Sequence, residues 1–207
     1  MNPVKHGVVP LALIVLVFAV AFVGCSKDGI DVTAKVLSVD GTAEIKNASA
    51  QSFVSAKVND TLDMGGVFKT GEASLASLEI INRGIVEIKP DSIFELEAGK
   101  DSIFQKAGVA IYKIDKNKEG FKVKAPHAVT CVLGTRFVVR ILDGMTVVGV
   151  EEGRVSVTAN NGEIREIAAG KKITIENSGF RGAEEEFDVN TDSFNYLQID
   201  GKWVPKE

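Results

Sequence analysis

The chain is poor in the residues that most catalytic and metal sites require. Its 207 residues include two cysteines, two histidines, two tyrosines and one tryptophan. With His6 and His127 as the only histidines, no cluster has zinc-ligand spacing. No Gly-x-Ser-x-Gly turn is present for a nucleophilic serine, and neither common glycine-rich phosphate loop occurs. We therefore expect no enzymatic activity, no cofactor and no metal site.

Paired carboxylates are present, but their spacing is that of strand surfaces. Glu95 alternates with Glu97, and Glu151 precedes Glu152. Acids placed in this way are expected to face solvent rather than to act as a general acid and base. A glycosidase would need two acids that are distant in sequence and face one groove, and the sequence identifies no such pair.

The chain also lacks a run of Lys or Arg. Its formal net charge is −4, and a nucleic-acid surface would need a basic stripe, so we expect no nucleic-acid partner. The acidic excess is concentrated after residue 183, which is typical of a solvated tail. The acids in that stretch are Glu184, Glu185, Glu186, Asp188, Asp192, Asp200 and Glu207, against the bases Lys202 and Lys206.

The N-terminal segment has the features of an export signal. Lys5 precedes an apolar run over residues 8–23, which ends in Gly24 and Cys25 before an abruptly polar stretch. The run contains Pro10 and is shorter than the roughly 20 apolar residues that a spanning helix needs. This pattern resembles a bacterial lipoprotein signal, although Phe22 stands where such signals usually have Leu.

The resemblance implies cleavage between Gly24 and Cys25 and acylation of the Cys25 sulfur. Residues 1–24 would then be the signal peptide and 25–34 a short linker from the anchor. We expect palmitate-type acylation and a location at the bacterial cell envelope, facing the periplasm or the exterior. The outer membrane is plausible because Ser26 follows the cysteine. An uncleaved anchor and an ordinary secretory signal are the alternatives, and both also export the chain.

The second cysteine, Cys131, lies in the apolar stretch 129–133. If Cys25 is acylated, Cys131 has no disulfide partner within the chain. We expect it to be a small buried hydrophobic residue, with a reactive or intermolecular thiol as the alternative.

Short strands separated by turn residues dominate the region from 32 to 175. Apolar and polar residues alternate with the period of two that places successive side chains on opposite faces of a strand. Asn, Asp, Gly and Pro between the runs are typical of tight turns. Strands are expected at residues 85–89, 93–97, 121–125, 136–141, 147–150, 155–157, 164–167 and 173–175.

We therefore predict an all-β fold, either solenoid-like or sandwich-like. Residues 71–78 could pass for a helix on composition, but their flanking pattern indicates strand. The final segment, residues 176–207, is interpreted as an acidic extension. Because it includes Phe194, Tyr196, Leu197, Ile199 and Trp203, we expect part of it to fold back on the main domain as a strand or short helix.

The order and spacing of these strand and turn segments resemble those of the FecR-type domain, over roughly residues 35–175. The family is named for a membrane regulator that relays ferric-citrate signals. Residues 67–76 resemble the family's signature of threonine and glycine followed by small residues and a strand. Residues 121–137 carry the strongest part of the resemblance. The other matching segments are residues 41–45, 58–62, 85–92, 148–155 and 169–172.

Four residues of these matching segments are assigned a structural role in turns: Gly71, Gly134, Thr135 and Gly153. Glycine lets the backbone turn where a side chain would clash. The Thr135 hydroxyl is expected to satisfy a backbone group of its turn.

The upstream segment departs from the family pattern. FecR-type regulators hold a sigma factor through a cytoplasmic segment, whereas about seven residues precede the apolar run here, so no sigma-factor partner is expected.

The sequence favours a non-catalytic, lipid-anchored binding or scaffold module that contacts another envelope protein or polymer. The alternative is a polysaccharide-binding or carbohydrate-active envelope protein with a β-stack groove, but aromatic residues are sparse.

Overall fold

The structure is a computed structural model that describes residues 33–98, 102–116, 120–142, 144–189, 192, 196–199 and 202–205. Gly24, Cys25 and the leader lie outside these residues. All the regular elements in the described residues are β-strands, which confirms the predicted all-β class. Among the same residues, no helix is long and apolar enough to span a membrane.

Seventeen of the described strands form one continuous hydrogen-bonded system that does not close into a barrel. Their pairings divide it into two sheets that share β9. The first sheet runs in the order β4 (Thr61–Leu62), β1 (Ala34–Asp40), β6 (Leu75–Ile80), β7 (Gly84–Ile88), β9 (Ser102–Ile114), β12 (Arg136–Leu142), β13 (Met145–Glu152), β16 (Lys171–Glu176) and β17 (Gly179–Glu186). The second sheet runs in the order β3 (Val54–Ser55), β2 (Ala43–Lys46), β5 (Val67–Thr70), β8 (Ile93–Leu96), β9, β10 (Phe121–Lys124), β11 (Ala128–Val132), β14 (Arg154–Ala159) and β15 (Ile164–Ala168).

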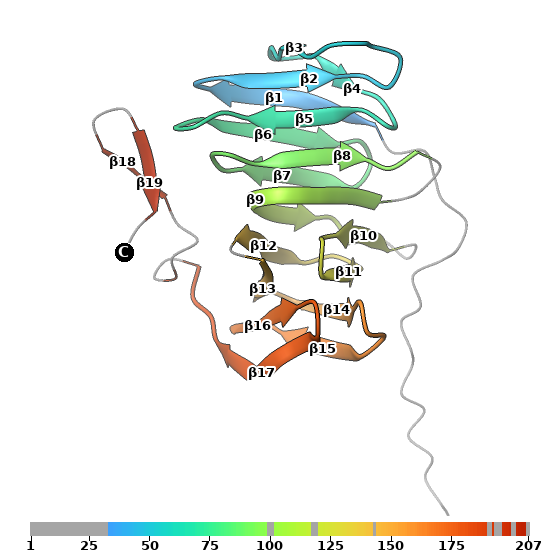
Figure 1. Cartoon of the computed structure of the whole chain (residues 1–207), viewed down its shortest axis with the longest axis vertical. Coiled ribbons are helices and arrows are strands. Elements are labelled where there is room, and N and C mark those ends of the chain that lie inside the picture. The colour runs from blue at the N-terminus through green and yellow to red at the C-terminus, as the bar shows by residue number, and fades with distance from the viewer. Residues whose placement is uncertain are drawn as a thin grey trace, which may run out of the picture.

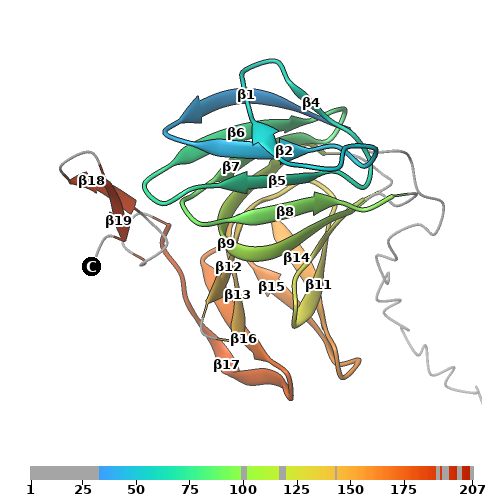
Figure 2. The same ribbon diagram turned by 45° about the horizontal axis from the view of Figure 1, so that its top comes forward.

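The chain passes repeatedly from one sheet to the other, so each successive segment adds strands to both. Figure 1 shows the result as a stack that begins with β1 to β4 at one end and finishes with β15 and β17 at the other. The tilted view in Figure 2 shows the same succession of layers. The arrangement is a sandwich of two long open sheets, and the β9–β10 pair is parallel while the neighbouring pairs are antiparallel.

Side-chain alternation explains why these segments are strands. In β6, Ala76, Leu78 and Ile80 are buried, whereas the intervening side chains are partly exposed. A strand places alternate residues on opposite faces, so this pattern buries one face of the sheet and leaves the other accessible. The strand interpretation of the segment around residues 71–78 is therefore confirmed from Leu75 onward.

The hydrophobic core lies between the two sheets. Tyr112 and Phe137 of the first sheet stack with ring centroids 5.0 Å apart. Phe68, Phe94 and Phe121 of the second sheet are fully buried in the same cluster. Aromatic rings of this size supply much of the apolar area that stabilises a core.

The long strand β9 joins the sheets by bending at Gly108. The N-terminal part of β9 pairs with β8 and β10, and the C-terminal part pairs with β7 and β12. Gly108 has φ = 83°, and a Cβ there would lie 2.1 Å from Ser92 Oγ. Only glycine suits this combination of backbone angle and close approach.

A second, smaller cluster covers the outer face of the first sheet. Beyond β17 the chain crosses back, and Phe187 and Val189 pack on Val109, Ile111 and Val138. The Phe187 ring lies directly over Gly149, where a Cβ would come within 2.8 Å of it. Part of the segment interpreted as an extension thus pairs as β17 and covers apolar surface on this sheet.

The final described strands form a separate hairpin. β18 (Tyr196–Ile199) pairs with β19 (Lys202–Pro205) in a two-stranded sheet of their own. In both views this hairpin is drawn to one side of the stack (Figures 1 and 2).

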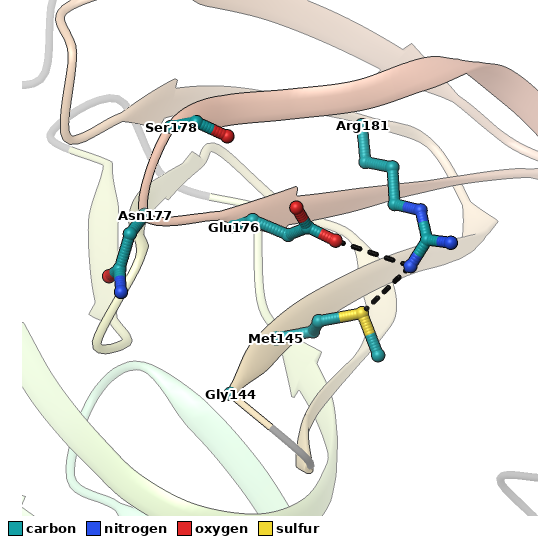
Figure 3. Close-up of a pocket in the computed structure, with 6 residues that line it drawn as sticks. All are labelled: Gly144, Met145, Glu176, Asn177, Ser178 and Arg181. Carbon is teal, nitrogen blue, oxygen red and sulfur yellow. Dashed lines mark hydrogen bonds and ion pairs between the residues drawn. The ribbon is translucent and has the colours of Figure 1, made fainter.

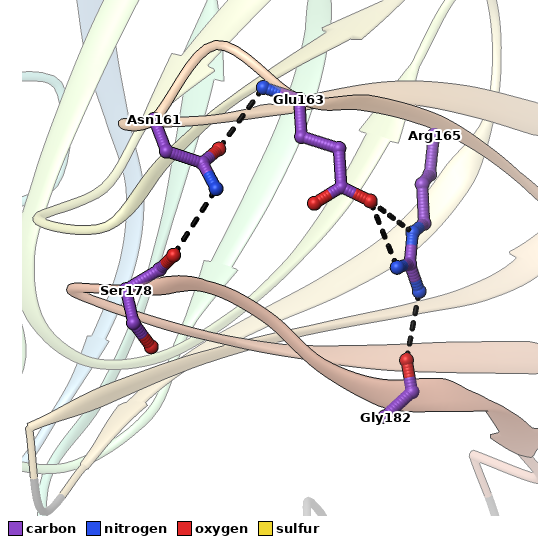
Figure 4. Close-up of polar contacts among 5 residues, drawn as sticks. All are labelled: Asn161, Glu163, Arg165, Ser178 and Gly182. Carbon is purple, nitrogen blue, oxygen red and sulfur yellow. Dashed lines mark hydrogen bonds and ion pairs between the residues drawn. The ribbon is translucent and has the colours of Figure 1, made fainter.

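Polar contacts close the far end of the sandwich, where the edge strands β15 and β17 lie (Figure 4). Asn161 Nδ2 donates to the Ser178 carbonyl at 3.1 Å, and Asn161 Oδ1 accepts the Glu163 N–H at 3.0 Å. Arg165 donates to the Gly182 carbonyl at 2.8 Å while pairing with Glu163 at 2.8 Å. These bonds join the β14–β15 turn to the β16–β17 hairpin and so connect the two sheets.

Candidate binding site

A groove on the outer face of the first sheet is the best candidate for a binding site. It has a volume of about 330 Å³ and crosses β1, β6 and β7. Short side chains form its floor, where the Ser38 and Ser77 hydroxyls lie 2.7 Å apart. Longer side chains surround this floor, namely Leu37, Leu75, Ile85, Glu87 and Lys89. Leu37 and Ile85 are 37% and 38% exposed, so the groove presents apolar surface to a partner.

Lys89, at one side of the groove, lies in surroundings that disfavour its positive charge. Burial lowers the pKa of Lys89, the Glu87 carboxylate opposes this by raising that pKa, and Arg136 lowers it further. The folded protein therefore disfavours the charged form of Lys89 relative to water. A carboxylate brought into the groove by a ligand would stabilise that charge.

The groove lies beside an incompletely paired strand. β4 pairs with β1 only at Ala34 and Lys35, whereas β6 pairs with β1 from Ala34 to Asp40, with a register shift at Leu37. The part of β1 from Leu37 onward thus has no strand on its outer side in the described chain. Backbone groups on such an edge can accept a strand from a partner.

A second hollow of about 470 Å³ lies at the end of β13 and at the β16–β17 turn (Figure 3). Arg181 Nη1 donates to Glu176 Oε1 at 3.2 Å and contacts the Met145 sulfur at 3.3 Å. The arginine and the glutamate neutralise each other inside the hollow. This site is open and polar, and it offers less apolar contact area than the groove.

The structure places the three predicted turn glycines at tight positions between strands. Gly134 has φ = 142°, and a Cβ there would lie 2.6 Å from Lys116 Cα. Gly153 has φ = 86°, and its Cβ would lie 2.9 Å from Thr135 Cγ2. Gly71 has no unusual φ, but its Cβ would lie 2.3 Å from Thr42 Oγ1. Gly134, Thr135 and Gly153 therefore meet at one crossing, and Gly71 belongs to another.

The expected role of the Thr135 hydroxyl is wrong. This buried oxygen has no hydrogen-bond partner among the described atoms. The Thr135 backbone makes the contact instead, because its N–H donates to the Ile114 carbonyl at 3.1 Å and its carbonyl accepts the Ile114 N–H at 3.0 Å. The side chain contributes through its methyl group, which packs against Gly153.

The position of Cys131 also differs from the expectation. Its side chain is only partly buried, and it alternates with the buried Thr130 and Val132, so it lies on the outer face of the second sheet. A strand within a largely apolar stretch still has two faces, which composition cannot distinguish. His127 is buried, and its Nδ1 lies 3.0 Å from Thr146 Oγ1, which joins the β10–β11 turn to β13.

Three of the four paired carboxylates, Glu95, Glu97 and Glu151, are engaged in ion pairs. Lys106 binds Glu95, Lys124 binds Glu97 at 2.9 Å, and Arg136 binds Glu151 at 2.5 Å. In the described part of the chain, no group of three or more His, Cys, Asp or Glu side chains could hold a metal ion.

The sequence interpretation did not identify the groove. Its floor depends on Ser38 and Ser77, which pair across β1 and β6 although they are 39 positions apart. The short side chains that follow Leu37 and Leu75 in the sequence were the signal that could have indicated a groove floor. Their significance depends on strand register, which the sequence does not specify.

Comparison with known proteins supports the domain type. The family model described as "FecR protein" matches residues 66–156, which is slightly less than half of the chain. No curated protein matches this chain.

Two similar solved structures are both of a proposed anti-sigma factor from Parabacteroides distasonis ATCC 8503, at 2.50 Å and 1.65 Å resolution. Each has a TM-score of 0.53 and 17% sequence identity, and the match covers 60% of this chain. It spans 61% of the length of those chains. At this identity the similarity establishes a shared β fold.

Proposed function

We propose that this protein is a non-catalytic, lipid-anchored module of the bacterial cell envelope that binds another envelope protein through the groove over β1, β6 and β7. The observation that carries the proposal is the groove itself, where Leu37 on β1 and Ile85 on β7 are exposed on either side of β6. The FecR match and the leader ending in Cys25 support an extracytoplasmic location.

The groove indicates what kind of partner it accepts. An extended segment that lies across β1, β6 and β7 could place an apolar side chain between Leu37 and Ile85. A carboxylate on that segment would face Lys89, whose charged form is disfavoured in the unbound protein. The proposed partner is therefore an acidic, extended peptide segment of an envelope protein. No sigma factor is included in this proposal.

The anchor can be tested with the two cysteines as a matched pair. Cys25→Ser should abolish incorporation of radiolabelled palmitate and leave an unprocessed precursor, because the acylated sulfur is lost. Cys131→Ser should incorporate label as the parent does, since Cys131 lies on the second sheet. Undiminished labelling of Cys25→Ser would contradict the anchor.

The groove can be tested by site-specific crosslinking in intact cells. A photoreactive amino acid at Ile85 should capture one defined envelope protein, whereas the same group at Thr158, on the outer face of the second sheet, should not. Lys89→Met should reduce capture at Ile85 about two- to fivefold, the scale of a weak, partly exposed ion pair. Equal capture at both positions would contradict the groove, and retention on polysaccharide without a protein partner would favour the carbohydrate-binding alternative.

A further inference from the structure

The end of the stack formed by β1 to β4 carries exposed apolar side chains. Val54 and Val58 are 60% and 53% exposed, the highest values among the large hydrophobic residues described. Both belong to the short segment that caps the sandwich at β3 and the turn after it (Figure 1). Exposed aliphatic side chains at a capping turn do not contribute to the core, so their position suggests an external contact.

Lysines surround this apolar tip. Lys69 Nζ lies 3.7 Å and Lys46 Nζ 5.4 Å from the ring centroid of Phe53, the residue before Val54. Lys57, between the two valines, is exposed. Apolar side chains flanked by long cationic ones suit the boundary between acyl chains and headgroups, where lysine stems can extend toward the phosphates.

Acidic residues at the same end limit the electrostatic contribution. Glu44, Asp60 and Asp63 lie near these lysines in the chain, and the Asp60 carboxylate accepts the Lys57 backbone N–H at 2.8 Å. Attraction to anionic lipid is therefore small, and the valines supply most of the contact.

Chain length places this end close to the anchor. β1 begins at Ala34, nine residues after Cys25, and nine residues span at most about 30 Å. The turn bearing Val58 is bonded directly to β1, because the Asn59 N–H donates to the Val36 carbonyl and the Val36 N–H donates to the Asp60 carbonyl, both at 2.9 Å. The anchor thus leads into the strand that holds the tip.

We infer that the Phe53–Val58 tip, meaning Phe53, Val54, Lys57 and Val58, docks on the surface of the bilayer that holds the acylated Cys25. This inference rests on the proposed lipid anchor. A contact of two valines is too weak to bind a membrane alone, but a short tether makes docking intramolecular and raises the effective concentration of the surface. Docking turns the β15 and β17 end away from the membrane and brings the open edge of β1 to the membrane side, while the groove on the outer face of the first sheet stays accessible from the side.

The test uses the full-length protein, processed in cells and reconstituted into phosphatidylethanolamine and phosphatidylglycerol vesicles. In a Cys131→Ser background, an environment-sensitive fluorophore is attached at Val54→Cys or, as a matched control at the opposite end, at Glu184→Cys on β17. The label at position 54 should emit at shorter wavelength and be quenched several-fold more by nitroxide-bearing lipids. Aqueous iodide should preferentially quench the label at position 184.

A second variant separates docking from folding. Val58→Asp changes an exposed side chain, so the melting temperature should be unchanged, while the label at position 54 should become accessible to iodide. Equal iodide quenching at both positions, with lipid on Cys25 shown by intact mass, would overturn the docking but leave the anchor. A label at position 54 that is shielded from both quenchers would indicate a protein contact and would also overturn the docking. Absence of lipid from Cys25 would overturn the anchor and the docking together.

Discussion

Gly134→Val is expected to unfold the domain or lower its free energy of unfolding by more than about 3 kcal/mol. Gly134 has φ = 142°, and its Cβ would lie 2.5 Å from Lys116 Cγ and 2.6 Å from Lys116 Cα. Because Lys116 Cα belongs to the backbone, a rotamer change cannot relieve the clash. The chain passes here from β11 of the second sheet to β12 of the first, next to the Thr135–Ile114 bond pair.

Gly162→Val is the matched control for the Gly134 experiment. Gly162 also has a positive φ, 88°, but a Cβ there would meet nothing within 4 Å. Gly162→Val should therefore lower the free energy of unfolding only by the cost of backbone strain, about 1–3 kcal/mol. Chemical denaturation followed by circular dichroism would compare the two variants. Equal losses in both would show that the contact with Lys116 does not contribute.

Gln105→Leu is expected to lower the free energy of unfolding by about 3–5 kcal/mol, because it leaves three buried polar groups without their partner. Gln105 is fully buried at the bend of β9. Its Nε2 donates to the Gly108 carbonyl at 3.0 Å and to the Val139 carbonyl at 3.1 Å. Its Oε1 accepts the Tyr112 hydroxyl at 2.8 Å, and burial raises the pKa of Tyr112 well above its usual value.

Tyr112→Phe is the matched control for the Gln105 network. It removes one hydroxyl and leaves Gln105 bonded to both carbonyls, so the expected loss is about 1–2 kcal/mol. The double variant should lose less than the sum of the two, since the Tyr112–Gln105 bond is counted in both. Additive losses, or a loss below about 1 kcal/mol for Gln105→Leu, would show that the network does not stabilise the bend.

The strands with regular alternation could be predicted from the sequence. Residues 85–89 and 121–125 alternate apolar with charged side chains, and they form β7 and β10. In each strand one face packs into the core and the other faces out, so local periodicity directly reflects burial. The order and spacing of these segments also indicated the resemblance to the FecR-type domain. The family match over residues 66–156 lies within the predicted domain.

The strand β9 was not identified because its sequence does not alternate. Val109 and Ile111 are buried beneath Phe187 and Val189 on the outer face, while Ala110 and Tyr112 are buried in the core. Burial on both faces removes the periodic signal, and the bend at Gly108 moves the strand from one sheet to the other. Neither effect is visible without the segments that pack on it from elsewhere in the chain.

Cys131 and Thr135 show the same limit at single residues. An apolar stretch indicated that Cys131 is buried, but its face of β11 is set by pairing with β10 and β14. Threonine beside glycine suggested a hydroxyl bonded in a turn, whereas the Thr135 backbone makes the bonds with Ile114. Both interpretations relied on residue type, and the outcome depended on the neighbouring strands.

The sequence by itself determined the all-β class, most strand positions between residues 84 and 176 and the glycines at crossings, because each depends on residues close together along the chain. The tertiary structure decided the two-sheet stack, the bend of β9, the cover supplied by Phe187 and the groove with Ser38 and Ser77 at its floor. These features depend on register between strands that are distant in sequence. A one-residue change in that register would move every side chain of a strand to the opposite face.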